Sequence, residues 1–151
     1  ELGGGALLDA GCYPVAAAHS LLGGSPERIT SSISFDEGYD VDIRGHALLE
    51  YSQGYSAFLE WGFGMNYTNM IRIWCEYATL SVNRAFSKPE SLTAIIEVRD
   101  SRGNIEILET GPCNHFREMF DSGIERNGID WVTQQSSLMS AIRRNSMEAH
   151  E

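Results

Sequence analysis

The pattern of apolar positions divides the chain into a helical start, a long stretch of strands and a helical end. Residues 6–22 are small and apolar with hardly any charge, and a glycine pair follows at 23–24. This pattern predicts a helix that begins near Ala10 or Gly11, is buried on most sides and ends at the glycines. Pro14 is compatible with this helix, because proline is tolerated in a first turn.

From residue 28 the apolar period changes to two, which is typical of strands. Seven segments follow this pattern: 28–36, 42–52, 57–63, 69–74, 79–83, 92–99 and 104–109. In the second segment the alternation predicts one face that consists of Ile43, Gly45, Ala47, Leu49 and Tyr51. Tight turns such as 53–54 connect most of the segments, which favours an antiparallel sheet.

After residue 112 the apolar spacing becomes helical again. Asn114 is expected to cap a helix over about 116–124, and a last helix is expected from about Trp131 to Met147. One helix, a run of strands and two further helices together predict an α+β fold. We expect an open, mostly antiparallel sheet with helices packed on one face. The length of 151 residues predicts a single domain over 1–151.

Charge and cysteine content narrow the classes of partner. Eleven Lys and Arg stand against 21 Asp and Glu, for a formal charge of −10. Nucleic acid and anionic membrane surfaces are therefore poor partners, because both require basic patches. No apolar run is long enough to span a membrane. An odd number of cysteines without CxxC spacing indicates a cytoplasmic protein with reduced, mostly buried thiols.

The strongest candidate for a catalytic site lies near the start of the chain. Asp9 and Tyr13 are four residues apart at the beginning of the first predicted helix, directly after a glycine run at 3–5. Residues with this spacing lie on one side of a helix. A tyrosine hydroxyl can exchange a proton with a carbinol oxygen, and a nearby carboxylate can orient the substrate. The simpler interpretation is that Asp9 caps the helix and Tyr13 is a core aromatic.

The segment GGGALLDAGCYPVAAAHSLLGGSPERIT resembles the opening of the C-terminal domain of the Gfo/Idh/MocA family, named after glucose–fructose oxidoreductase and inositol dehydrogenase. The family pattern is a glycine run, D-x-G-x-[YH], a helix that ends in LLG, and E-P-x-x-V. The later segments YSQGYSAFLEWGF, IRIWCEYATLSV and NHFREMF resemble its paired strands, a strand–turn–strand unit and a late helix. Together the matches cover nearly the whole chain in the family order.

This resemblance implies a two-domain NAD(P)-dependent oxidoreductase that acts on a sugar, cyclitol or related polyol. An N-terminal Rossmann domain would bind NAD or NADP and supply a catalytic lysine from an E-K-P motif. The C-terminal domain would shape the substrate site, form a homo-oligomer through its sheet face, and supply the motif acid and its tyrosine or histidine. These last two positions match Asp9 and Tyr13, which become the expected catalytic residues.

The departures from the family matter as much as the matches. The chain has no G-x-G-x-x-G after a strand and no E-K-P, and Lys88 stands in Ser-Lys-Pro. We therefore expect the substrate and oligomerisation half alone, without the family domain's first strand or the Rossmann domain, which would join in cis or in trans. No cofactor is expected on this chain alone, and the chain alone is expected to be inactive. The alternative is a free-standing, non-catalytic module that binds a ligand or dimerises.

Other candidates carry weaker signals. Cys113 and His115 have metal-ligand spacing, but two ligands do not make a zinc site, and no metal is expected. Asn66, Tyr67 and Arg84 lie near predicted strand ends, where they could contact substrate. A set of aromatic residues is compatible with either a sugar pocket or core packing: Tyr55, Phe58, Trp61, Phe63 and Tyr67.

Overall fold

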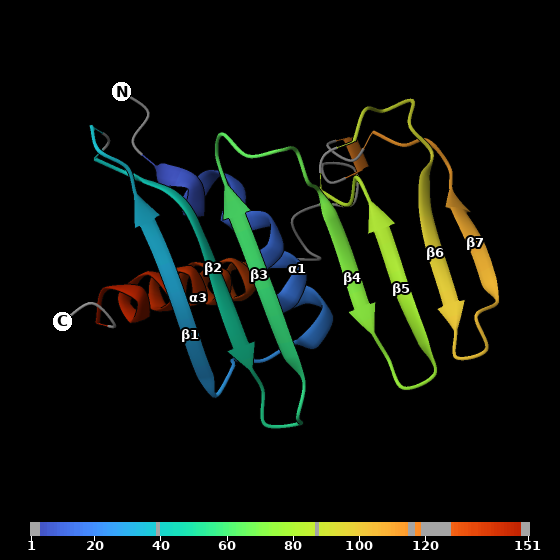
Figure 1. The fold of residues 1–151 in the computed structure, drawn as a ribbon, viewed down its shortest axis with the longest axis horizontal. Helices are drawn as coiled ribbons and strands as arrows, with labels where there is room; N and C mark the ends of the chain where they lie inside the picture. The colour runs from blue at the N-terminus through green and yellow to red at the C-terminus, as the bar shows by residue number, and fades with distance from the viewer. Residues whose placement is uncertain (1–3, 39, 87, 115–116, 119–127, 149–151) are drawn as a thin grey trace. The chain divides into compact units, whose positions relative to one another are not determined.

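The computed structural model describes the chain except for residues 1–3, 39, 87, 115–116, 119–127 and 149–151. It divides the chain into two compact units. Unit 1 comprises residues 1–65 and 127–151, and unit 2 comprises residues 66–126. Each unit contains one antiparallel sheet (Figure 1). The expectation of a single domain over 1–151 stays a prediction.

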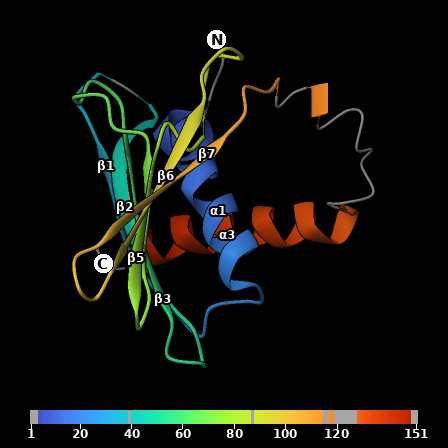
Figure 2. The ribbon, with the colours of Figure 1, turned by 90° about the vertical axis from the view of Figure 1, so that its right-hand side faces the viewer.

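Unit 1 is a three-stranded sheet with helices on one face. A π-helical segment, η1 (Leu7–Gly11), continues into α1 (Cys12–Leu22), and the chain then forms β1 (Arg28–Phe35), β2 (Asp42–Glu50) and β3 (Ser56–Gly62). The last helix is α3 (Ile129–Glu148). Figure 2 shows α1 and α3 on the same side of the sheet. The α+β fold class expected from the sequence is confirmed, with the strands divided between two hydrogen-bonded sheets.

The core of unit 1 lies between this sheet and its helices. The largest fully buried side chains come from η1, α1, β2 and α3: Leu7, Val15, Leu49 and Ile142. Helix α3 also covers the free edge of β1, where Asn145 Oδ1 accepts a hydrogen bond from the Ser31 backbone N–H at 2.8 Å. Ser146 Oγ accepts one from the Ile33 N–H, also at 2.8 Å. An edge strand with paired N–H groups no longer offers a template for another strand.

One predicted strand face is wrong at its first residue. The pairing of β1 with β2 shifts between Ser34 and Phe35, so that Ile43 is an extra residue in β2 with no paired residue in β1. Because this β-bulge changes the alternation, Asp42 rather than Ile43 is the buried residue at the start of β2. Gly45, Ala47 and the rest of that face keep the predicted orientation.

Unit 2 is an antiparallel meander of β4 (Met70–Trp74), β5 (Ala78–Asn83), β6 (Ala94–Asp100) and β7 (Ile105–Thr110). One face carries seven aliphatic side chains, each at least partly exposed, with Glu106 and Asp100 toward one end: Ile71, Ile73, Leu80, Val82, Ile96, Val98 and Leu108. The helix expected over 116–124 falls largely outside the described residues. Its expected cap, Asn114, accepts a hydrogen bond from the Arg117 backbone N–H at 3.0 Å. No helix in the described part of the chain could cross a membrane.

Candidate functional site

The first helix begins with an irregular, wide turn. Residues Leu7–Gly11 form a π-helix, and regular α-helix follows from Cys12. Pro14 explains the irregularity, because its ring would collide with the carbonyl of residue 10 in a regular α-helix and it has no N–H to donate. A wider turn before the proline relieves that collision. Short π-helical turns of this kind are frequent at functional sites.

Asp9 and Tyr13 lie on the outer side of this helical segment. Both are exposed, Tyr13 by 48%, whereas Leu7 and Val15 on the inner side are buried. Tyr13 is therefore not a core aromatic. Asp9 lies inside the helix and not at its cap, which is Ala6. The simpler structural interpretation of the pair thus fails, while the catalytic role of the two residues stays a prediction.

A side chain from β2 binds the first turn of the helix. The buried Asp42 side chain accepts a hydrogen bond from the Leu7 backbone N–H through Oδ2, at 2.6 Å. Gly5 lies against the same carboxyl group with φ +70°, and a Cβ there would collide with Oδ1. A glycine run before a helix N-terminus can bind a pyrophosphate. Here the Asp42 carboxyl group lies at that position.

Cys12, between the two candidate residues, is not an activated nucleophile. Burial, and secondly the nearby charge of Asp9, raise the pKa of its thiol above the ordinary value. Its Sγ donates a hydrogen bond to the Asp9 carbonyl at 3.4 Å. The three cysteines are free, and the expectation that they are mostly buried is wrong for Cys75, which is exposed after β4. Cys12 and Cys113 are half-buried.

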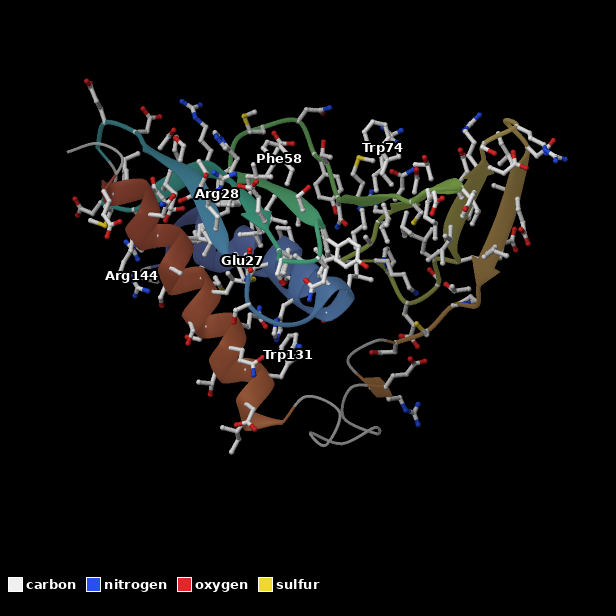
Figure 3. All side chains as sticks on the ribbon, turned by 90° about the horizontal axis from the view of Figure 1, so that it is seen from below. Glu27, Arg28, Phe58, Trp74, Trp131 and Arg144 are labelled. Atoms are coloured by element: carbon white, nitrogen blue, oxygen red, sulfur yellow. The ribbon has the colours of Figure 1, made fainter. Side chains whose placement is uncertain are left out.

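The aromatic candidates divide into core and surface residues. Trp61 is buried, whereas Tyr55, Phe58, Phe63 and Tyr67 are exposed. Figure 3 shows Phe58 on the sheet face away from α3. In unit 2, the Arg84 guanidinium lies 4.7 Å from the centre of the Tyr67 ring. Arg84 has φ +56°, the only positive φ outside glycine among the described residues.

Lys88, which does not match the lysine of the family's E-K-P motif, is hydrogen-bonded to the backbone of unit 2. Lys88 donates hydrogen bonds to the carbonyls of Leu92, at 3.1 Å, and Cys113, at 3.3 Å, which gives it a structural role. His115 lies outside the described residues. Within the described residues, no three metal-binding side chains gather at one point.

The candidate pair lies outside the groove between the first helical segment and the last helix. A groove of about 320 Å³ runs between η1 and α3, and Leu8, Val132 and Met139 are among its lining residues. Neither Asp9 nor Tyr13 lines it.

Sequence reasoning proposed Asp9 and Tyr13, whose role stays a prediction, and it did not anticipate the buried Asp42. The alternating pattern placed Ile43 on the inner face, and the β-bulge that moves Asp42 there has no signal in the apolar pattern. The sequence offers one weak signal, which is that Asp42 is the first residue of a predicted strand. A carboxyl group at that point needs a hydrogen-bond partner if its side chain faces the core.

Comparisons with known proteins agree on one family. The family model described as the GFO/IDH/MocA C-terminal domain matches residues 1–81. A dTDP-3,4-didehydro-2,6-dideoxy-alpha-D-glucose 3-reductase from Saccharopolyspora spinosa is 37% identical over 156 residues, which cover 94% of this chain and 47% of that protein. D-xylose 1-dehydrogenase (NADP(+)) 2 from Haloferax volcanii is 29% identical, over 91% of this chain and 43% of that protein.

Solved structures show the same relationship. A 3-ketoreductase from Actinomadura kijaniata, in complex with NADP and TDP-benzene, matches with a TM-score of 0.83 and 28% identity. The match covers 95% of this chain and 46% of that one. An aldose-aldose oxidoreductase from Caulobacter crescentus, at 22% identity and a TM-score of 0.81, shares the fold. The chain thus spans about half the length of these relatives.

Proposed function

This chain belongs to the GFO/IDH/MocA C-terminal domain family, and on that premise we propose that it is the substrate-binding and oligomerisation half of an NAD(P)-dependent oxidoreductase that acts on a sugar, cyclitol or related polyol. The reductase and dehydrogenase relatives support a sugar substrate, and the NADP named with two of them supports the cofactor class. One observation carries the proposal: Asp9 and Tyr13 are exposed together on the helix that carries the family motif.

In the complete protein, bound NAD(P) would supply the redox chemistry, which is hydride removal from a carbinol carbon in one direction and hydride addition to a carbonyl carbon in the other. The cofactor would be bound mainly by an N-terminal Rossmann domain, because this chain has no G-x-G-x-x-G motif after a strand. This chain would contribute the residues that transfer the proton. The Tyr13 hydroxyl would exchange a proton with the reacting oxygen, and Asp9 would orient that oxygen and the phenol.

The test compares two tyrosine variants in the complete protein. Tyr13→Phe is expected to lower kcat by about 100-fold or more, which is the usual effect of removing a general acid or base. The Kd for NADP should stay within about twofold, because the cofactor is bound elsewhere. Tyr77→Phe is the matched control, since Tyr77 is 72% exposed in the turn between β4 and β5. Equal kcat in all three proteins would refute the role of Tyr13.

The apolar face of unit 2 supports the oligomer that belongs to this proposal. Its seven partly exposed aliphatic side chains share one side of a four-stranded sheet. Exposed apolar patches of this kind mark interaction surfaces. We expect sedimentation velocity at tens of micromolar to show a dimer or a larger species, and a monomer alone at that concentration would count against this part of the proposal.

A further inference from the structure

Asp42 is a buried acid that the proposed proton chemistry does not use. Only 2% of its surface is exposed, and its carboxyl group accepts the Leu7 N–H across 35 residues of sequence. Neither ion pair among the described residues involves Asp42. Burial of a carboxyl group is unfavourable unless something compensates for it. The positive end of the helix dipole, together with the unpaired N–H groups of the first turn, provides that compensation.

Two local irregularities bring this contact about. The extra residue Ile43 in β2 turns Asp42 from the outer to the inner face of the sheet. Gly5 takes a left-handed backbone conformation, and it leaves room for Oδ1 that a side chain would fill. Both irregularities lie at the same point, although they come from segments far apart in the chain.

A capping side chain from another element also fixes the position of the helix, which a local capping residue does not do. An N-cap serine or aspartate satisfies its own helix without fixing where the helix lies. Here the N-cap residue is Ala6, which has no side-chain cap hydrogen bond, and the acceptor comes from β2. The bond therefore fixes the start of the helix against the sheet. The anchored amide of Leu7 is two residues before Asp9 and six before Tyr13.

We propose that Asp42 is a positioning residue that sets the place of Asp9 and Tyr13 by anchoring the first turn of their helix to β2. The inference rests on the proposed function of that pair. If the anchor is lost, the two side chains remain but lose their common placement. Displacement of catalytic groups by about 1 Å can lower a rate by roughly 100-fold. The loss should appear in kcat more than in KM, because substrate binding has other contacts.

The test uses three variants of the complete protein. Asp42→Ala removes the acceptor, Asp42→Asn keeps an oxygen acceptor without the charge, and Ser146→Ala is the matched control. Ser146 is also buried and also accepts a backbone N–H, that of Ile33, but it ties α3 to β1. A purely structural effect should therefore be the same for Ser146→Ala as for Asp42→Ala.

Hydrogen exchange of the backbone amides, followed by mass spectrometry, reports on the anchor without any need for activity. Asp42→Ala should speed exchange over residues 7–13 by at least about tenfold, with Asp42→Asn between it and the wild type, and Ser146→Ala should leave that segment unchanged. Kinetics then report on positioning. Asp42→Ala should lower kcat by roughly 10- to 100-fold with KM within about threefold, and Asp42→Asn should recover most of kcat.

Three results would overturn the proposal. They are unchanged exchange over residues 7–13 in Asp42→Ala, an equal effect of Ser146→Ala on kcat, and a loss in Asp42→Ala that lies in KM alone. If Asp42→Ala does not fold, Gly5→Ala replaces it, because the added Cβ displaces the carboxyl group without removing it. A wild-type protein without hydride transfer would refute the proposed function, whereas an active wild type with unchanged Asp42→Ala kinetics would refute the positioning role alone.

Discussion

The packing of Trp61 between two glycines gives a prediction whose magnitude follows from the structure. Gly45 lies directly opposite Trp61 in the pairing of β2 with β3. A Cβ on Gly45 would come within 2.6 Å of Trp61 Cζ2 and 2.8 Å of the Ser32 backbone oxygen. On the other side, Gly11 would place a Cβ at 3.1 Å from the same indole. The indole thus fills the space that the two glycines leave.

Gly45→Ala should destabilise unit 1 by about 1–2 kcal/mol. The added carbon would be about 0.8 Å closer to the indole than ordinary contact allows. Neither neighbour can move easily, because Trp61 is buried and Ser32 is paired in the β1–β2 ladder. Overpacking of this kind costs about 1–3 kcal/mol. The lower entropy of the unfolded chain offsets about 0.4–1 kcal/mol of that cost.

Urea denaturation measures this difference, and a second glycine provides the control. Gly111→Ala makes the same chemical change where no atom lies within 4 Å, so stability should stay unchanged or rise by up to about 1 kcal/mol. The double variant of Gly45→Ala with Trp61→Phe should be less unstable than the sum of the single variants by about 1 kcal/mol, because phenylalanine lacks Cζ2. Additivity of the two changes, or equal stability of Gly45→Ala and Gly111→Ala, would refute the reasoning.

Two further predictions concern a buried phenol and a strained backbone. Tyr51 is buried, and its hydroxyl has no partner among the described residues, so Tyr51→Phe should stabilise the protein by about 1 kcal/mol. Burial also raises the pKa of Tyr51 above 10.0, so its contribution is fully present below pH 10 and is lost as pH rises through the folded-state value. Urea unfolding from pH 8 to 11 should show this loss of stability in the wild type and in the exposed control Tyr55→Phe. Tyr51→Phe should lose less stability over the same range. Equal pH profiles for the three proteins would contradict the prediction. Arg84→Gly should be more stable than Arg84→Ala by about 1 kcal/mol in thermal unfolding, because φ is +56° and both variants lose the Tyr67 contact equally; equal midpoints would contradict the strain.

The sequence by itself determined the order and type of most elements in the described part of the chain, while the helix expected over 116–124 stays a prediction. The helix that ends before Gly23, the seven strands and the last helix lie where periodicity predicts them, within a few residues. Periodicity works here because the sheet of unit 1 has one covered and one exposed face, so each strand carries a clean alternation. The motif around Asp9 and Tyr13 was also visible, since residues four apart on a helix lie on one side whatever the rest of the chain does.

Only the tertiary structure decided which side chain holds that motif in place. The Asp42 side chain faces the core because β2 contains one extra residue relative to β1. The apolar pattern of the sequence does not show this bulge, because the bulge depends on the register of β2 with β1. The division of the strands into two sheets is likewise set by backbone hydrogen bonds between elements. Local patterns report the face that a residue prefers, whereas the contact between Asp42 and Leu7 exists only when the sheet and the helix meet.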